Sequence, residues 1–447
     1  MDTVICDYNY VFANRSALGR LPAINFEDVG KPNLVIDEAH NLPSRALGYY
    51  SPALSGFVLE KMREELKGLP KKFAGGGVDL LEQALEVIKS FAPKGGKSEK
   101  IVLRIEPFLE MDESLKSFLS KYLDSDVEIK PRDVVLKFVF YWSEFTDILR
   151  QVLENDRPEF FTSFHFETSG GVIKITCCDA SEMLKPRYES YQQIVAFSAT
   201  LKPFAYYAKL SGLESEKLLT AEFQSPFEAE KRKILVIPQI STKYSERERN
   251  YSKIAETIQR VTELKAGNYL AFFPSFDFME KTFQQLRVPA GFKIVRQNRF
   301  MKNDEVDAII EGLKEASTPT IIMGVQGGHF SEGVDYPGDM VIGAFVIGPP
   351  LPNFDFERET MKAYYQESYQ KGFEYAYTYP AMAKAIQSAG RVIRSESDSG
   401  IIVLMDDRFL DKNYSQSMPA DWFEHSPHEL VSSSILKDVK EFWQRNE

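Results

Sequence analysis

Apolar and polar positions alternate along the chain in blocks that predict two kinds of structure. Short apolar runs that end at acidic or turn-forming residues are typical of strands buried in a parallel sheet. Such runs are LVI at 34, IVAFSATL at 194, ILVI at 234, YLAFF at 269, TIIMGV at 320, MVIGAFVIG at 340 and GIIVLM at 400. From residue 227 onward they alternate with helix-like segments. That alternation predicts an open α/β domain built from βαβ units.

Between residues 54 and 154 the spacing of apolar positions becomes helical. Leu81, Leu85 and Ile88 recur at intervals of three or four, as they would on one face of a helix. The pattern predicts an all-helical insertion over residues 51–155.

Segments on both sides of this insertion predict a first α/β domain that it interrupts. A strand candidate at Thr3–Cys6 precedes the insertion, and a hairpin candidate around Gly170-Gly171 follows it. The expected fold class is therefore α/β, with a first domain in two parts. The predicted boundaries are 1–50 and 156–226 for the first domain, 51–155 for the insertion and 227–447 for the second domain.

Composition limits the classes of function. At 447 residues the chain is too long for one hydrophobic core, and its 43% hydrophobic and 27% charged residues are those of an ordinary globular protein. The formal net charge of -11 argues against polyanion binding by the whole surface, although a local basic groove stays possible. The sequence shows no apolar stretch long enough to cross a bilayer and no secretory pattern, so we expect a cytoplasmic protein.

The stretch Asp37-Glu38-Ala39-His40 places two carboxylates and an imidazole directly after an apolar run. The carboxyl ends of parallel strands are where such sheets bind ligands. Asp37 is suited to hold Mg²⁺ beside a phosphate, and Glu38 to orient and deprotonate an attacking water. The alternative is a strand that ends in a solvated acidic turn.

The segment QSAGRVIRS places Gln387, Arg391 and Arg394 at positions i, i+4 and i+7, on one face of a predicted helix. Two guanidiniums and an amide on one face suit the oxygens of a γ-phosphate, and Gly390 permits close backbone approach. The alternative is a basic helix face paired with surface acids such as Glu396.

A glycine-rich segment, residues 324–339, follows the apolar run TIIM, and its turns are expected to expose Ser331, Glu332 and Asp335. Glycines at a strand exit permit positive φ and leave amides pointing outward, which suits phosphate or ribose. The alternative is an ordinary loop rich in turn-forming residues.

Taken in order, the acidic strand end, a Ser-Ala-Thr turn at 198–200, the glycine-rich loop and the arginine helix resemble motifs II, III, V and VI of superfamily-two helicases. The closer resemblance is to the XPD family of iron–sulphur DNA-repair helicases. It is carried by VIDEAHNL, FSATL, FFPSF, GGHFSEGVDY and QSAGRVIRS, and it covers essentially the whole chain. It implies two RecA-like motor domains, with the 51–155 insertion as the helical Arch.

The resemblance assigns residues to nucleotide chemistry. Asp37 matches the Mg²⁺ ligand, Glu38 the residue that activates water, and His40 a nucleotide-side residue that couples to DNA. The γ-phosphate-facing helix is matched by Gln387, Arg391 and Arg394 as catalytic residues. Further nucleotide-binding positions are Gly333, Asp335 and Gly390.

The resemblance also assigns residues to coupling and to DNA. Ser198, Thr200 and Glu332 match positions that couple the two ligands. Phe273, Pro274 and Ser275 match a stretch beside the single strand. His329 stands where relatives often carry a basic residue that contacts DNA.

Two parts of the family's machinery are absent from the sequence. The phosphate loop needs backbone amides, a lysine and a hydroxyl, and the GKS at 96–98 lacks the preceding strand and glycine. The iron–sulphur cluster needs four cysteines ahead of the DEAH stretch, whereas the chain has only Cys6, Cys177 and Cys178. We therefore expect a missing N-terminal segment that carries both, an incomplete first motor domain, and a chain that is inactive alone and binds no cluster.

The expected function is that of an ATP- and Mg²⁺-dependent helicase that unwinds DNA from the 5′ end in nucleotide excision repair, most similar to archaeal, nucleoid-associated members. Expected partners are single-stranded DNA, DNA forks and repair proteins that bind the Arch; we expect a monomer without membrane contact. Two alternatives stay open: a damage-inducible helicase of the DinG type, and a non-catalytic scaffold that binds DNA or protein partners.

Overall fold

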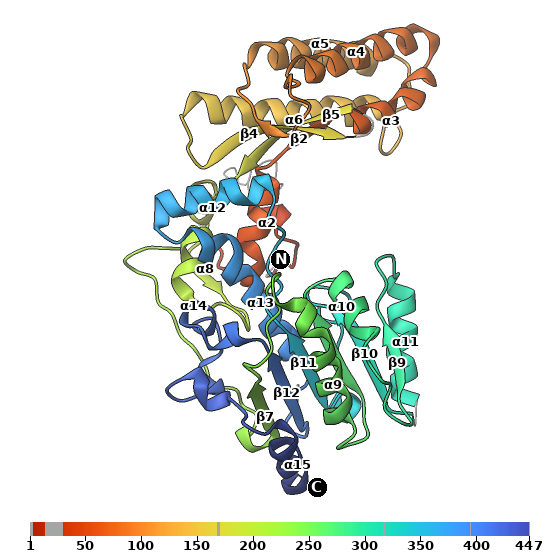
Figure 1. Ribbon diagram of the computed structural model, residues 1–447. Coiled ribbons are helices and arrows are strands. Elements are labelled where there is room, and N and C mark those ends of the chain that lie inside the picture. The colour runs from red at the N-terminus through yellow and green to blue at the C-terminus, as the bar shows by residue number, and fades with distance from the viewer. Residues whose placement is uncertain (1–2, 14–29, 168–169, 316–317, 394, 447) are drawn as a thin grey trace. The chain divides into compact units, whose positions relative to one another are not determined.

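A computed structural model describes residues 3–13, 30–167, 170–315, 318–393 and 395–446. The chain forms two compact units (Figure 1). Unit 1 comprises residues 1–196, 208–215 and 359–364, and unit 2 comprises residues 197–207, 216–358 and 365–447. The domain boundaries expected at 50, 155 and 226 stay predictions.

Unit 2 is built on a six-stranded parallel sheet with the order β7-β12-β11-β8-β10-β9. Its strands are β7 (Arg232–Val236), β8 (Tyr269–Phe273), β9 (Lys293–Arg296), β10 (Thr320–Val325), β11 (Gly343–Ile347) and β12 (Gly400–Met405). Strands β8, β11 and β12 are buried at every position, because helices cover both faces of the sheet. The α/β fold class is confirmed.

Two apolar cores lie on the opposite faces of this sheet. Helices α9 (Tyr251–Thr262), α10 (Phe276–Phe283) and α15 (Ile435–Arg445) pack on one face. Helices α11 (Asn303–Glu315) and α13 (Tyr379–Ala389) pack on the other. Successive strand residues point to opposite faces, so Phe272 enters one core and Phe273 the other. The remaining helices that belong wholly or partly to unit 2 are α8 (Phe204–Leu210), α12 (Phe356–Tyr369) and α14 (Lys412–Ser415).

Unit 1 contains a parallel pair of strands, β1 (Leu34–Ile36) and β6 (Ile194–Ala196), which are far apart in sequence. Around them lie α1 (Asn9–Phe12), α2 (Leu42–Tyr49) and α7 (Ser181–Tyr188). The prediction of a strand at Thr3–Cys6 is wrong, since these residues are extended or irregular without strand pairing and their side chains are exposed. An apolar run without a neighbouring strand to complete its hydrogen bonds forms no sheet.

The insertion is mainly helical but is not all-helical. Its helices are α3 (Gly56–Lys67), α4 (Lys71–Ser90), α5 (Glu106–Leu123) and α6 (Val134–Glu154). They accompany a four-stranded antiparallel sheet of order β2-β5-β4-β3 (Figure 1). The short strands β2 (Ala53–Ser55) and β3 (Glu99–Lys100) escaped the pattern because two or three residues carry no detectable periodicity.

The predicted hairpin is confirmed as β4 (Phe160–Glu167) and β5 (Gly170–Cys177). Its place differs from the expectation, however, because β5 pairs with β2 and β4 pairs with β3, both inside the insertion. Phe164 fills the space that a side chain at Gly171 would need, since an added Cβ there would lie 2.1 Å from the phenyl ring. The hairpin therefore completes the sheet of the insertion instead of resuming the β1–β6 sheet. Within the described ranges, no helix is long and apolar enough to span a membrane.

Candidate functional site

The two acids of the DEAH stretch lie at the exit of β1, where the chain turns sharply. Asp37 and Glu38 are both exposed, and Glu38 adopts the left-handed backbone conformation at φ 47°. The Asp37 Oδ1 accepts a hydrogen bond from the Glu38 N–H at 2.7 Å. The buried His40 places its Nδ1 3.2 Å from the Glu38 carboxylate. A left-handed non-glycine residue costs free energy, which is consistent with a site where side-chain direction matters.

Tyr8 fixes this turn from the side. Its hydroxyl donates to the carbonyl oxygens of Asp37 and Glu38, the latter at 2.9 Å. Burial, followed by the charges of Asp37 and Glu38, raises the pKa of Tyr8 to about 12. Tyr8 therefore stays protonated and remains a donor across the physiological pH range.

Asp37 fits the chemistry of a Mg²⁺ ligand, because Mg²⁺ is commonly held by one or two carboxylates together with water and phosphate oxygens. One Asp37 oxygen is engaged by the Glu38 N–H, and the side chain is exposed. No group of three or more His, Cys, Asp or Glu residues able to hold a metal occurs in the described part of the chain. A bound nucleotide would have to supply the other oxygen ligands.

In unit 2, one glycine inside β10 and one in the loop after it make room for a glutamine. An added Cβ at Gly328 would lie 2.7 Å from the Gln297 side chain, and one at Gly324 would lie 2.9 Å from it. Gln297 Oε1 accepts the Val325 N–H at 3.1 Å, and its Nε2 lies 3.4 Å from His329 Nδ1. These two glycines therefore leave space for the side chain of the residue that directly follows β9. The prediction of a phosphate- or ribose-binding loop did not include this packing role.

Arg391 holds the glycine-rich loop, but it does so from outside the helix. Helix α13 ends at Ala389 and the N–H of Gly390 bonds back to Ile386, so the prediction that Arg391 lies on the helix face with Gln387 is wrong. Its Nε donates to the Ser331 carbonyl at 2.8 Å and its Nη1 to the Val334 carbonyl at 2.9 Å. The chain leaves the helix at Gly390, and the Arg391 guanidinium then lies against the loop.

The other predicted residues of the glycine-rich segment and of QSAGRVIRS differ in exposure. Glu332, Gly333 and Asp335 are exposed, and Gly333 has φ 75°, a conformation that favours glycine. Ser331 is fully buried, so the expectation that the turns expose it is wrong. Gln387 is half-buried on α13, and Arg394 lies outside the described residues. Their roles stay predictions.

The Ser-Ala-Thr turn follows β6. The Thr200 N–H donates to Ser198 Oγ at 3.4 Å, and Thr200 is buried. The Thr200 hydroxyl has no hydrogen-bond partner among the described residues. A buried hydroxyl without a partner costs free energy.

The FFPSF stretch divides between core and surface. Phe273 is fully buried, because the last position of β8 faces the core under α10. Its assignment to a stretch beside the single strand stays a prediction. Pro274 is half-buried and Ser275 is exposed, where Ser275 Oγ accepts the Phe278 N–H and caps α10. Tyr336, in the glycine-rich segment, is also fully buried and donates to the Phe330 carbonyl.

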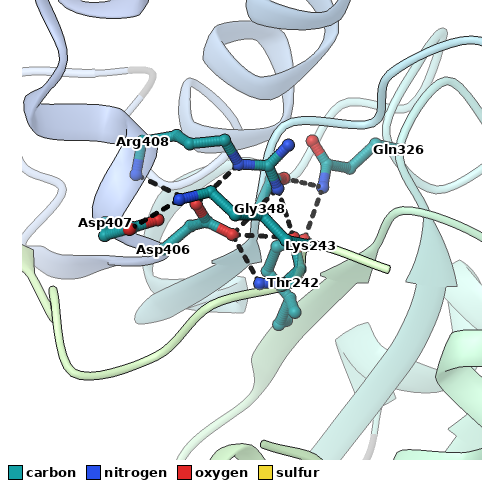
Figure 2. Close-up of polar contacts among 8 residues, drawn as sticks. Thr242, Lys243, Gln326, Gly348, Asp406, Asp407 and Arg408 are labelled. Atoms are coloured by element: carbon teal, nitrogen blue, oxygen red, sulfur yellow. Dashed lines mark hydrogen bonds and ion pairs between the residues drawn. The ribbon is translucent and has the colours of Figure 1, made fainter. Parts of the chain in front are cut away.

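A buried ion pair organises the same edge of the sheet, at the exit of β12 (Figure 2). Asp406 is buried and accepts hydrogen bonds from Arg408 Nε at 2.8 Å and from Thr242 Oγ1 at 2.7 Å. Lys243 forms an ion pair with Asp407 at 2.9 Å. Gln326 Nε2 donates to the Gly348 carbonyl at 2.7 Å. The loop after β7 is thereby fixed to the ends of neighbouring strands.

Burial acts to raise the pKa of Asp406. The hydrogen bonds and the positive charge of Arg408, together with the hydrogen bond from Thr242, lower it by more. The pKa of Asp406 consequently lies below its ordinary value, and the carboxylate is ionised at neutral pH. Sequence analysis missed this cluster, although acids directly after the run GIIVLM give the same signal that identified Asp37 and Glu38.

The GKS at 96–98 lies in the loop between α4 and β3, inside the insertion. A phosphate loop connects a strand to the N-terminus of a helix, whereas this loop leaves a helix and enters a two-residue strand. The structure therefore agrees with its rejection as a nucleotide site. Cys177 and Cys178 are buried and Cys6 is exposed.

Comparison with known proteins finds similarity to DNA helicases. Residues 258–425 match the family described as Helicase C-terminal domain. The General transcription and DNA repair factor IIH helicase subunit XPD/RAD3 of Saccharomyces cerevisiae is 25% identical over 267 residues, which cover 54% of this chain and 33% of that protein. A solved XPD helicase structure aligns with a TM-score of 0.56 and 18% identity over 92% of this chain and 70% of that chain. The chain is therefore similar to XPD helicases in sequence over about half of its length, and in fold over most of it.

The chain is also similar to a bacterial helicase. The ATP-dependent DNA helicase DinG of Photobacterium profundum is 27% identical over 233 residues, which cover 50% of this chain and 33% of that protein. The chain thus spans about a third of the length of these curated relatives. The segment that matches the helicase C-terminal domain, residues 258–425, contains the glycine-rich loop, Arg391 and Asp406.

Proposed function

We propose that the chain is the motor portion of an ATP-dependent DNA helicase that moves 5′ to 3′ and acts in nucleotide excision repair. The observation that carries the catalytic part is the turn after β1. There Asp37 and Glu38 are both exposed, and the backbone between them is fixed by Tyr8. Exposed acids on a fixed turn at a strand exit suit a metal-bound triphosphate and its attacking water.

In this proposal Asp37 holds Mg²⁺, which neutralises charge on the phosphates when it is bound. Glu38 accepts a proton from the attacking water, and His40 orients the Glu38 carboxylate through their 3.2 Å contact. Arg391 and Gln387 serve the γ-phosphate together with Arg394. Arg391 additionally fixes the loop that carries Glu332 and Asp335, because it binds the carbonyls of Ser331 and Val334.

The repair role and the direction rest on family likeness alone. The yeast relative's name includes DNA repair, and DinG is named only as an ATP-dependent DNA helicase. Since the two relatives are similar to this chain to about the same extent, a DinG-type helicase is the second candidate. An archaeal source, an iron–sulphur cluster outside these residues, and repair partners on the insertion belong to the first candidate.

The catalytic assignment is tested by Glu38→Gln in an ATPase-competent form of the protein, which needs a phosphate loop from outside these 447 residues. Turnover should fall at least about a hundredfold, the usual worth of a general base, while ATP and DNA binding persist. Glu189→Gln, at an exposed glutamate of the same unit, is the matched control. Turnover of Glu38→Gln within a few-fold of the unsubstituted protein would overturn the assignment.

A further inference from the structure

We propose that Phe300 is a stacking contact for a base of single-stranded DNA, presented at the carboxyl end of β9. The inference rests on the proposed function, and it names a residue that neither the motifs nor the family match singles out. Phe300 is 89% exposed, in a unit where Phe272, Phe273 and Phe345 are fully buried. The sequence alone gives no reason to separate it from the other 32 phenylalanines, given 33 in total.

The turn that carries Phe300 is fixed at both ends. On one side, Gln297 is buried and its N–H donates to the Met323 carbonyl at 2.9 Å. Its side chain lies against Gly324 of β10 and Gly328 of the following loop. On the other side, Met301 enters the core beneath the sheet, and the Lys302 N–H donates to Glu305 at 2.8 Å.

Within the turn, the Asn298 side chain accepts the Phe300 N–H at 2.9 Å. This local bond is typical of asparagine in tight turns and it sets the direction of the residue that follows. Because the flanking residues are anchored, Phe300 cannot fold back into the core without breaking these contacts. The ring is therefore held in solvent, which is unfavourable unless a partner covers it.

The charges beside the ring favour a polyanion. Arg299 and Lys302 are exposed, and among the described residues neither forms an ion pair. The Arg299 guanidinium lies over the Phe276 ring at 5.2 Å, which orders its side chain at low cost. Arg296 differs, because Glu280 binds it at 2.6 Å. Aromatic rings flanked by unpaired cations are the usual means of binding single strands without base preference.

The position of the turn also fits a continuous strand path within unit 2. Strands β8, β10 and β9 are neighbours, and their carboxyl ends carry Ser275, His329 and Phe300 in that order. Neighbouring strands lie about 4.8 Å apart, so three strand ends span a distance of the order of two nucleotides. In this arrangement Ser275 and His329 contact the DNA backbone and Phe300 stacks on a base. None of these contacts reads the base sequence, as a helicase that moves along any DNA requires.

The test measures binding of fluorescein-labelled oligothymidine to the full 447-residue chain by anisotropy at low salt. Phe300→Ala should weaken binding about 5-fold or more, the worth of one stacked base, whereas Phe300→Tyr should bind nearly as well as the unsubstituted chain. Phe223→Ala is the matched control, since Phe223 is 87% exposed in a loop of the same unit. Its binding should not change.

A second readout separates stacking from a general loss of structure. The native tryptophans Trp142, Trp422 and Trp443 are all buried, so the indole of Phe300→Trp reports on the surface. Its emission should be quenched by oligothymidine at the concentrations that saturate the anisotropy. Suppose that the unsubstituted chain binds oligothymidine, that Phe300→Ala binds it equally well, and that the indole of Phe300→Trp is not quenched. That result overturns the Phe300 proposal and leaves the proposed function standing. If the unsubstituted chain does not bind, the DNA-binding part of the proposed function falls with it.

Discussion

Arg391 donates a hydrogen bond from Nε to the backbone carbonyl of Ser331 at 2.8 Å. A residue expected to meet a γ-phosphate thus also fixes the loop expected to sense both ligands. Because a guanidinium is planar and has five donors, one arginine can bind two loop carbonyls at once. The state of the loop and the direction of the arginine are therefore linked.

Arg391→Ala should lower both stability and activity. Two hydrogen bonds to a charged donor are lost, which predicts destabilisation of unit 2 by about 2 kcal/mol, and the loop loses its support. Thermal unfolding measures the first effect, and ATP turnover in an ATPase-competent form of the protein measures the second. Unchanged thermal unfolding would contradict the structural role of Arg391.

Arg394→Ala should be compared with Arg391→Ala, because both substitutions remove one arginine from the same segment. If Arg394 acts on the transferred phosphoryl group, hydrolysis should fall far more than single-strand binding, because such arginines act mainly in the transition state. Equal losses of hydrolysis and of DNA binding would contradict that assignment.

Asp406→Asn should destabilise the protein in a pH-dependent way. The pKa of Asp406 in the folded state lies below the ordinary 3.8, so the stabilisation by its ionised form is complete above about pH 4. It is lost as the pH falls through the lower folded pKa. Breaking this buried pair at pH 7 should cost about 3 kcal/mol, because Arg408 is left without its partner.

The measurement for Asp406 is denaturant unfolding at pH 7 and again near pH 3, where the difference between the variant and the unsubstituted chain should shrink. Asp407→Asn is the matched control, because that neighbouring acid forms a half-exposed pair with Lys243. Its loss should cost less than about 1 kcal/mol at either pH. Equal effects of the two substitutions would show that burial of the Asp406 pair contributes nothing.

The 447-residue chain by itself should show no DNA-stimulated ATP hydrolysis. Backbone amides and the lysine of a phosphate loop provide most of the grip on the β- and γ-phosphates, and the only GKS in the sequence lies inside the insertion. Weak, salt-sensitive single-strand binding should persist through unit 2. Steady hydrolysis that Glu38→Gln abolishes would exclude a contaminant and contradict this prediction.

Sequence by itself determined the features that depend on local order. The apolar runs predicted the strands of unit 2, since residues buried on both faces of a parallel sheet must be apolar throughout. Helical periodicity over tens of residues likewise predicted the long helices of the insertion. Acids after β1 identified the Asp37–Glu38 turn, because residues adjacent in the chain need no tertiary contact to be brought together.

Tertiary structure alone decided the features that depend on partners distant in sequence. Strands β2 and β3 exist because β4 and β5 offer hydrogen bonds to residues that have no strand pattern of their own. Phe273 and Phe300 are the same residue type near strand ends, yet one is buried under α10 and the other is held in solvent by an anchored turn. The Arg391 guanidinium reaches Ser331 across 60 positions only because α13 ends at Ala389. Composition and spacing do not encode such differences, since burial and hydrogen bonding are set by which segments the fold brings together.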